Sequence, residues 1–386
     1  MTQQSVSHCR ISLSDSGRPK PRLDNEQLKR QFFEYMAEAL GRDPATVDRA
    51  AQALARFEWH TGGASFTAFD KDQAISFKAA LLAETNQRTG APLAKSTVLA
   101  TLHPVREFFS WLPGLPSFRS KIDRSAAAYL TPSNKDVTRS RSRRERAVPS
   151  VEQMALVLDT MPATTPIQRR DRAVVALAIA TAARADAIAT LRIKHVDLAK
   201  NCIIQSSDQV RTKFGKTIIS YLVAIVPSAG AIVHGWCREL IRDHGWGPDD
   251  PLFPALTNRY GDDGLFQHDG FERRCWATSQ SVRIIFARAC KSAGLPYYNP
   301  HTMRAMQVRW LHSLNPTEEE LKALSQNLGH EDVAVTRVHY GRLERDHQAK
   351  LLTTICMPRA KNDPTIARDA LKALEALSDV FRKQLK

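Results

Sequence analysis

Apolar side chains recur at helical spacing along the first third of the chain. Between Glu26 and Leu40, the residues Leu28, Phe32 and Leu40 lie about one or two helical turns apart, so they share one face of an α-helix. The predicted helices cover 26–40, a segment capped by Asp43-Pro44 that includes Phe57, a segment from Asp70 that is closed by Gly90, and 96–112 with a bend at Pro104. We therefore expect residues 23–128 to form a small helical domain, preceded by a flexible basic segment at 1–22.

Beyond Val148 the pattern mixes helical and strand-like segments. Thr165-Pro166 begins a helix that continues to Ala180, and β-branched runs at 202–205 and 218–226 predict strands that flank a turn. Further helices are predicted at 231–243, 279–293, 300–314 and 316–327, and Gly329 suits the end of the last one. The fold class predicted for residues 150–360 is mainly α with a small β-sheet, an α+β domain.

A dense basic run separates these two parts. Residues 129–149 are polar and charged, and Arg139, Arg141, Arg143 and Arg144 lie at their centre. Such a run cannot pack into a core, so the segment is either a solvated tether or an arm that crosses a polyanion. Salt would weaken each phosphate contact of such an arm, because binding releases counterions.

One more amphipathic helix is predicted at 361–386. Asp363-Pro364 caps this helix, and Leu371 and Phe381 belong to its apolar stripe. The stripe either packs on its own domain or docks on a neighbouring protomer, because a large apolar patch is rarely left exposed.

The charge balance favours a polyanionic partner. Lys and Arg number 55 against 40 Asp and Glu, which gives a net charge of +15 and is compatible with DNA, RNA or an anionic membrane surface. The longest apolar run, 173–183, is about half a membrane span, and the polar N-terminus does not resemble a signal peptide. Six cysteines form no CxxC pair, which argues against a zinc knuckle or a disulfide framework. We expect an intracellular, reduced and soluble protein.

Two other patterns have simple interpretations. Phe214-Gly-Lys-Thr217 looks like the end of a nucleotide-binding P-loop, but the first glycine of that motif would fall at Val210. The tryptophans, Trp59 among them, are expected in the core. No metal-ligand spacing is apparent among the histidines.

Residues suited to phosphodiester chemistry occur in order along the second part. Imidazoles, guanidiniums and a phenol can together hold a phosphodiester, attack its phosphorus and manage the protons without a metal ion. His301 and Arg304 lie three residues apart in the first turn of a predicted helix, where the backbone N–H groups favour an anion. In chain order, the set is Arg184, Lys213, His301, Arg304, His330 and Tyr340.

This set resembles the active-site pattern of the tyrosine recombinase (phage integrase) family. The likeness rests on His301-Thr-Met-Arg304, Leu328-Gly-His330 and Tyr340, and covers about 150–350 by motif and 24–128 by pattern alone. It implies a site-specific DNA recombinase that cleaves and rejoins strands through a 3′-phosphotyrosyl intermediate, for integration or excision of mobile DNA. It also implies that the helical domain binds DNA and that the second domain is catalytic.

The resemblance implies a role for each residue. Arg184 and Arg304 would bind the two non-bridging oxygens of the scissile phosphate with planar forks that lysine cannot copy. Tyr340 would attack phosphorus, His301 would assist proton transfer, and His330 would hydrogen-bond the phosphate.

The leaving 5′-oxygen needs a proton, for which the resemblance offers Lys213 at the tip of the β-turn, with Lys216 as a rival that otherwise contacts DNA. No ATP, metal or other cofactor is implied. The partners implied are double-stranded DNA, further copies of the chain up to a tetramer in the synapse, and accessory proteins, with no membrane. The expected location is the cytoplasm, in association with the nucleoid.

Two departures from the family pattern stand out. Tyr340 is one residue further from His330 than is common, although a branch with the spelling Leu-Gly-His-Glu and Tyr-Gly is similar to Glu331 and Tyr340-Gly341. Ala187 stands where many relatives have a glutamate that orients the first arginine. Two other functions stay open: a type IB topoisomerase-like enzyme, and a non-catalytic DNA-binding regulator on the same fold.

Overall fold

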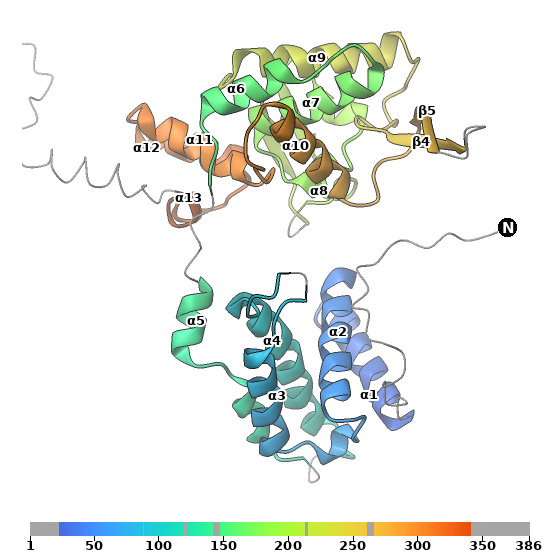
Figure 1. Ribbon diagram of the computed structural model, residues 1–386, viewed down its shortest axis with the longest axis vertical. Helices are drawn as coiled ribbons and strands as arrows, with labels where there is room; N and C mark the ends of the chain where they lie inside the picture. Colours follow the sequence, from blue (N-terminus) through green and yellow to red (C-terminus); the bar gives the residue numbers. More distant parts are fainter. Residues whose placement is uncertain are drawn as a thin grey trace, which may run out of the picture. The chain divides into compact units, whose positions relative to one another are not determined.

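The computed structural model describes residues 23–87, 89–118, 122–141, 147–212, 215–260 and 266–340. The chain divides into two compact units, 1–146 and 147–386, each with its own hydrophobic core. The predicted fold class is confirmed, because helices predominate and the strands form two small antiparallel sheets (Figure 1).

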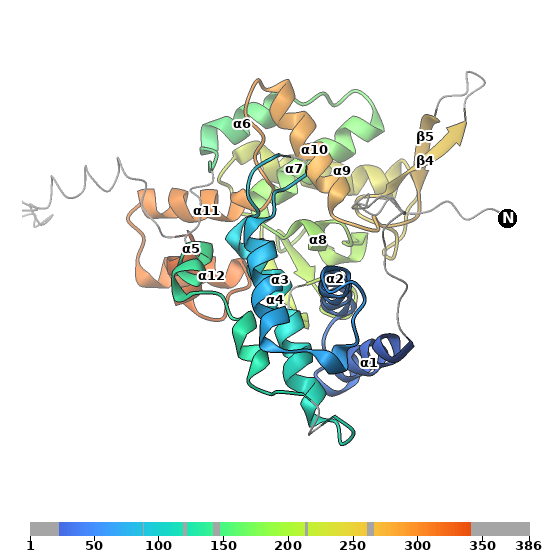
Figure 2. The ribbon, with the colours of Figure 1, turned by 60° about the horizontal axis from the view of Figure 1, so that its bottom comes forward.

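The first unit contains the four predicted helices. Asp43 and Asp70 cap two of them by accepting hydrogen bonds from backbone amides one turn later, at 2.9 Å and 2.8 Å. The third helix ends before Gly90, which instead closes a turn by donating to the carbonyl of Asn86 at 2.8 Å. Figure 2 shows these helices packed side by side. Their bounds are α1 (Leu23–Glu34), α2 (Pro44–His60), α3 (Lys71–Ala83) and α4 (Lys95–Trp111), with a π-helical turn (Tyr35–Ala39) after α1.

Aromatic rings fill the core of the first unit. Phe69 stacks on Phe109 with 3.6 Å between ring centroids, and Phe57 meets the edge of Phe109 at 5.0 Å. Trp59 was expected in this core, and that prediction is wrong: its side chain is 50% exposed. Two residues correspond to about 200° around a helix, so Trp59 faces away from the buried Phe57.

Part of the basic segment at 129–149 is helical. Helix α5 (Asn134–Arg141) follows a short 3₁₀ segment (Ala126–Leu130), and Asp136 forms a 3.1 Å ion pair with Lys95 of α4. The backbones of Arg139 and Arg141 lie in α5, but their side chains are outside the described part of the chain, as are Arg143 and Arg144 altogether.

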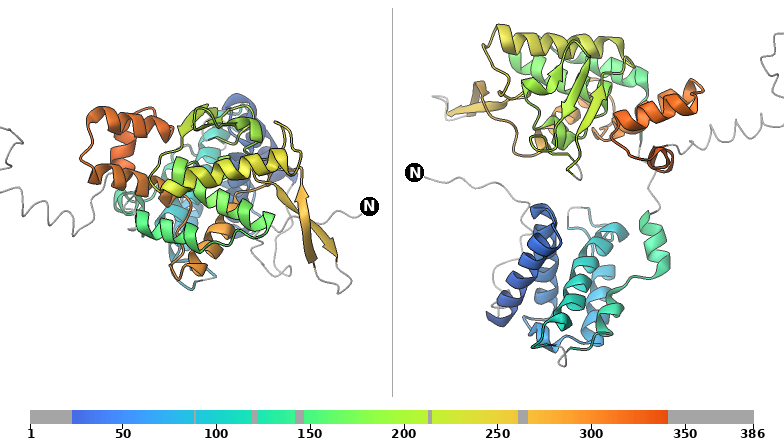
Figure 3. Two further views of the ribbon diagram at one scale, coloured as in Figure 1. Left: turned by 90° about the horizontal axis from the view of Figure 1, so that it is seen from above. Right: turned by 180° about the vertical axis from the view of Figure 1, so that it is seen from behind.

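The second unit is built around helix α7 (Pro166–Thr181). Every residue from Ala173 to Thr181 is buried, because α6 (Val151–Thr160), α9 (Pro227–Arg242) and α10 (Gln280–Ser292) pack around this helix. The predicted start is confirmed: the hydroxyl of Thr165 accepts from the amide of Gln168 at 3.3 Å in a capping box. Figure 3 shows α7 running alongside α9.

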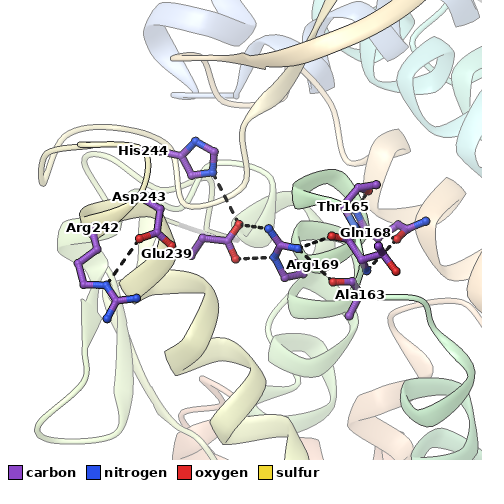
Figure 4. Close-up of polar contacts among 9 residues, drawn as sticks. Ala163, Thr165, Gln168, Arg169, Glu239, Arg242, Asp243 and His244 are labelled. Atoms are coloured by element: carbon purple, nitrogen blue, oxygen red, sulfur yellow. Dashed lines mark hydrogen bonds and ion pairs between the residues drawn. The ribbon is translucent and has the colours of Figure 1, made fainter.

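A bidentate ion pair fixes the first turn of α7 against α9 (Figure 4). Arg169 donates from Nε and Nη2 to the two carboxylate oxygens of Glu239, at 2.7 Å and 3.0 Å. The same guanidinium donates to the carbonyls of Ala163 and Thr164 at 3.1 Å and 2.6 Å, and His244 approaches Glu239 at 3.6 Å. The start of α7 is therefore tied to two other segments, which fixes the direction of the helix.

The sheet beside α7 has strand order β1-β2-β3 and is antiparallel throughout. Its strands are β1 (Val196–Asp197), β2 (Cys202–Gln205) and β3 (Ile218–Tyr221). The strand predicted at 218–226 was too long. It ends at Tyr221, and a short loop at 222–226 leads to the start of α9 at Pro227. The sequence did not predict the hairpin of β4 (Ala255–Tyr260) and β5 (Phe266–Glu272), which projects from the second unit in Figure 1.

In the described part of the chain, three helices follow α10: α11 (Thr302–Ser313), α12 (Glu318–Asn327) and α13 (Val333–Tyr340). The prediction for Gly329 is confirmed, because its φ of +72° ends α12 in the left-handed region that glycine tolerates best. The C-terminal helix predicted at 361–386 and the segment 1–22 lie outside the described residues. Within the described part of the chain, no helix is long and apolar enough to cross a membrane.

Candidate active site

His301 and Arg304 begin helix α11. His301 is its N-cap, so the helix starts slightly later than predicted, and the His301 amide is held by the side-chain oxygen of Asn299 at 2.9 Å. The His301 side chain is exposed, whereas Arg304 is only 3% exposed. The first turn of α11 thus carries a buried guanidinium and an exposed imidazole, at a helix end where the backbone N–H groups favour an anion.

Arg304 is in direct contact with His330. The Nη1 of Arg304 lies 3.2 Å from the Nε2 of His330, and a guanidinium can only donate, so Nε2 accepts. The proton of the neutral ring is then on Nδ1, which lies 2.8 Å from the hydroxyl of Thr336. The Thr336 hydroxyl in turn donates a hydrogen bond to Ser325 Oγ at 2.8 Å. This chain of hydrogen bonds fixes both the tautomer and the orientation of His330.

Thr336 also indicates where Tyr340 lies. Both residues are on α13, four positions apart, so their backbones are on the same face of the helix. Thr336 is fully buried against His330 and Ser325. The backbone of Tyr340 therefore lies one turn beyond the contact with His330, although its side chain is outside the described part of the chain.

The β2–β3 hairpin is docked on the segment that carries His330. The hydroxyl of Ser220 donates to the carbonyl of Asn327 at 2.8 Å, and a Cβ built at Gly329 would lie 2.5 Å from Ile218. Lys216, in the turn before β3, forms an ion pair with Glu331. Lys213 precedes Lys216 by three positions in the sequence and lies outside the described residues.

Arg184 follows the end of α7 by three residues. Ala182 leaves the helix in the left-handed region at φ +49°, and Arg184 then adopts an extended conformation as the N-cap of α8 (Ala185–Ile188). Its side chain is half-buried. Ala187, at the position where many relatives have glutamate, is 1% exposed and packs in the core of the second unit.

Gln307 connects the segments of the two arginines. It lies one turn after Arg304 on α11, is fully buried, and donates from Nε2 to the carbonyls of Ile179 and Ala180 at 2.7 Å and 3.1 Å. Sequence reasoning missed this residue, together with Thr336 and Asn327. The only available signal for Gln307 was an amide three positions after Arg304, on the face that a helix buries.

The pair of Arg304 and His330 has a clear chemical capacity. It presents cationic and imidazole groups on rigid helices, which can neutralise a phosphodiester and stabilise the charge that develops when phosphorus is attacked. Among the described residues, no three His, Cys, Asp or Glu side chains come together as metal ligands.

Known proteins are similar to this chain over most of its length. Residues 148–347 match the model of the phage integrase family. A tyrosine recombinase XerC of Xanthomonas campestris pv. campestris (strain B100) is 25% identical over 346 residues, which cover 89% of this chain and 88% of that protein. A tyrosine recombinase XerC of Roseiflexus sp. (strain RS-1) is 25% identical over 255 residues, or 64% of this chain and 68% of that protein.

Solved structures share the fold at low sequence identity. A lambda integrase dimer bound to a COC′ core site superposes with a TM-score of 0.55 at 12% identity, covering 83% of this chain and 97% of that chain. The Tn1549 transposon integrase in complex with circular intermediate DNA gives 0.54 at 14% identity, covering 86% and 99%.

Proposed function

Since this chain belongs to the phage integrase family of tyrosine recombinases, site-specific enzymes that transfer DNA strands, we propose that Tyr340 is its nucleophile. Tyr340 attacks the scissile phosphorus, a 3′-phosphotyrosyl bond forms, and the bond to the 5′-oxygen breaks. The observation that supports this proposal is the contact between Arg304 and His330, with Thr336 linking that pair to the helix of Tyr340. The attack of the freed 5′-hydroxyl on the phosphotyrosine reverses the step, so the diester's energy is conserved.

Arg184 and Arg304 each bind one non-bridging oxygen and neutralise the charge of the transition state. His301 is exposed beside Arg304 and takes the phenol proton as Tyr340 attacks. His330 accepts a hydrogen bond from Arg304 through Nε2 and so helps to hold the guanidinium. To donate to the phosphate itself, the ring must also carry a proton on Nε2, and a bound phosphodiester favours that proton because of its negative charge.

Lys213 protonates the leaving 5′-oxygen. Its rival Lys216 already forms an ion pair with Glu331, the residue that follows His330. To reach the 5′-oxygen, the Lys216 ammonium would first have to leave this carboxylate. The pairing therefore favours Lys213 as the acid, with Lys216 as a support of the hairpin that also reaches the DNA backbone.

The DNA partner is double-stranded, and the net charge of +15 suits its phosphates. The first unit, with its helical core, holds one face of the duplex, and the arginines at 139, 141, 143 and 144 bind its backbone as the chain passes between units. Four copies assemble in the synapse, with the C-terminal segment at 361–386 docking on a neighbour and accessory proteins directing the choice of site. Integration or excision of mobile DNA, at the nucleoid, is the biological use we propose.

Trapping of the covalent intermediate tests this function. The probe is a set of duplexes made from the DNA that flanks the gene, each with a nick placed so that the short 5′ leaving strand diffuses away after cleavage. The wild-type protein should give a protein–DNA adduct that survives denaturation. Tyr340→Phe should bind the same duplexes and form no adduct, whereas Tyr221→Phe, on the exposed side of β3, should behave as the wild type.

The products distinguish the three functions. Recombinant joints between two duplexes identify a recombinase. An adduct combined with relaxation of supercoiled plasmid, and no joint between duplexes, identifies a topoisomerase-like enzyme. Binding with no adduct on any flanking duplex identifies a regulator and contradicts the proposal.

A further inference from the structure

Gln307 is bound in a way that fixes the orientation of its amide. Both of its partners, the carbonyls of Ile179 and Ala180, can only accept hydrogen bonds, so the NH₂ group must face them. The side chain is fully buried. Removal of a buried donor from two carbonyls is costly, because those oxygens cannot be resolvated.

These two carbonyls are the ones that Ala183 and Arg184 would bond if α7 continued, since a helix pairs each carbonyl with the amide four residues later. The chain departs instead. The amide of Ala183 turns to the hydroxyl of Thr181 at 3.2 Å, and the carbonyl of Ala180 also accepts from the amide of Val223 at 2.8 Å. Gln307 therefore occupies the bonding positions that a continued helix would use, and the chain is held in the path that leads to Arg184.

The same helix carries the other arginine. Arg304 and Gln307 are three residues apart on α11, so one rigid turn presents Arg304 and at the same time holds the exit of α7. Ala187, at the position where many relatives have the orienting glutamate, is buried and has no polar side-chain atom. The backbone path that Gln307 holds is therefore one means by which this chain can place Arg184.

We propose that Gln307 is the positioning residue that sets Arg184 in register with Arg304, so that both arginines reach one phosphate. This inference rests on the proposed function, in which the two arginines bind the non-bridging oxygens of the scissile phosphate. It assigns no contact between Gln307 and DNA.

The test uses Gln307→Met, which keeps the length of the side chain and removes both hydrogen bonds. Gln307→Asn, which keeps the amide but shortens its reach, is the second variant if the first does not fold. In the free protein, hydrogen–deuterium exchange at residues 182–188 should rise in the variant, because the backbone path is no longer held. This readout is independent of catalysis.

Cleavage provides the second readout. A small displacement of a binding group costs on the order of 100-fold in rate, so adduct formation should fall by about that factor with duplex binding unchanged. The deficit should shrink well below that factor when the oxygen that Arg184 binds is replaced by a methyl group in one stereoisomer of a methylphosphonate duplex, because the charge that Arg184 would stabilise is then absent. That stereoisomer should be the one that relieves Arg184→Ala, and not the one that relieves Arg304→Ala.

The matched control is Gln153→Met, on α6. Gln153 is a partly buried glutamine that closes the capping box with Ser150 and accepts from the Tyr298 hydroxyl at 3.1 Å. Its loss should lower thermal stability without changing the exchange at 182–188 or the preference between stereoisomers.

Three results would overturn the inference: unchanged exchange at 182–188, equal loss of cleavage on every substrate, or relief by the stereoisomer that belongs to Arg304. If the wild-type protein forms no adduct, the proposed function fails, and the exchange measurement alone decides whether Gln307 holds the path to Arg184.

Discussion

The side chain of Asn327 pairs with the backbone of Tyr221 as a neighbouring strand would. The amide of Tyr221 donates to Oδ1 at 2.6 Å, and Nδ2 donates to the carbonyl of Tyr221 at 3.2 Å. The last residue of α12 thus continues the sheet at the edge of β3. The hairpin that contains Lys213 and the turn that contains His330 are joined by this pair and by the Ser220 bond to the Asn327 carbonyl.

Asn327→Ala should destabilise the second unit and weaken catalysis together. The part-buried amide and carbonyl of Tyr221 lose their partner, and two lost hydrogen bonds cost about 1–3 kcal/mol together. Thermal unfolding should shift down by roughly 2–4 °C for each kcal/mol in a unit of this size. The exposed neighbour Gln326→Ala should leave the melting temperature within about 1 °C. Equal melting of the two variants would contradict the pairing role.

Gly329→Ala should be more damaging than an alanine at another left-handed glycine. Gly329 combines a φ of +72° with a virtual Cβ only 2.5 Å from the Ile218 side chain, so strain and overlap add. Gly245 has a φ of +64° and nothing within 4 Å of its virtual Cβ, so Gly245→Ala measures the strain alone, about 1 kcal/mol. Urea unfolding should show an extra loss of about 1–3 kcal/mol at Gly329. When Ile218→Ala is combined with Gly329→Ala, the extra loss of stability at Gly329 should disappear. If the effects of the two substitutions simply add, the close approach of Gly329 to Ile218 is refuted.

Arg304→Lys should reduce adduct formation by about 100- to 1,000-fold, the scale of losing one transition-state donor. Lysine keeps the charge, but it has no planar fork to bind a phosphate oxygen and His330 Nε2 at the same time. Single-turnover cleavage at saturating protein measures this loss, and gel shifts should show that binding of the duplex is nearly unchanged. Cleavage within about tenfold of wild type would remove Arg304 from the phosphate site.

Sulfur in place of the 5′-bridging oxygen should restore cleavage by Lys213→Ala. A thiolate leaves without a proton, so the general acid becomes dispensable. The same substrate should do little for Arg304→Ala, which lacks charge stabilisation instead. Lys216→Ala should lose its pair with Glu331 and show a modest defect on both substrates. Sulfur rescue of Lys216→Ala alone would transfer the acid role to that lysine.

The second unit should become less stable as the pH drops below about 6.5, in part because of His195. Burial lowers the pKa of this imidazole from its ordinary value of 6.5, so the unfolded chain takes up the proton first. The contribution is therefore complete above about pH 6.5 and is lost as pH falls towards the folded pKa. Protonation also removes the Nδ1 acceptor of the Arg192 amide, a bond of 2.9 Å.

His195→Asn isolates this effect, because an amide oxygen accepts at every pH. Between about pH 7.5 and pH 5.5 the melting temperature of the wild type should fall more than that of the variant, because only the wild type takes up a proton at this position on unfolding. Differential scanning calorimetry at the two pH values measures the difference. If the melting temperatures of the two proteins change with pH in parallel, protonation of His195 does not contribute to the pH dependence of stability.

Local signals made most of the helices predictable. Asp43, Asp70 and Thr165 each cap the amide of a residue only three positions later, so the information for a helix start is contained in a few neighbouring letters. The same reasoning failed for Trp59, because composition favours burial of tryptophan but the phase of the helix directs this one outward.

Long-range amide contacts could not be predicted in this way. Asn327 and Gln307 bond to backbone groups of β3 and α7, which lie more than a hundred residues earlier in the chain, and any buried strand or helix end offers the same backbone groups. The positions of His301, Arg304 and His330 could be anticipated only through the resemblance to a family. Their roles and that of Tyr340 stay predictions until the variants are measured.

The distances along the chain between these partners set an order of events during synthesis. Ile179 leaves the ribosome 128 residues before Gln307, and Ser220 leaves 107 residues before Asn327. The first unit and α7 are therefore synthesised before α11, which carries Arg304 and Gln307. At that stage the segment of Arg184 still lacks its hydrogen bonds from Gln307. If the first unit binds DNA as proposed, a nascent or truncated chain would bind DNA before the groups proposed to cleave it are assembled. Binding would then be separated from cleavage until the last helices are made.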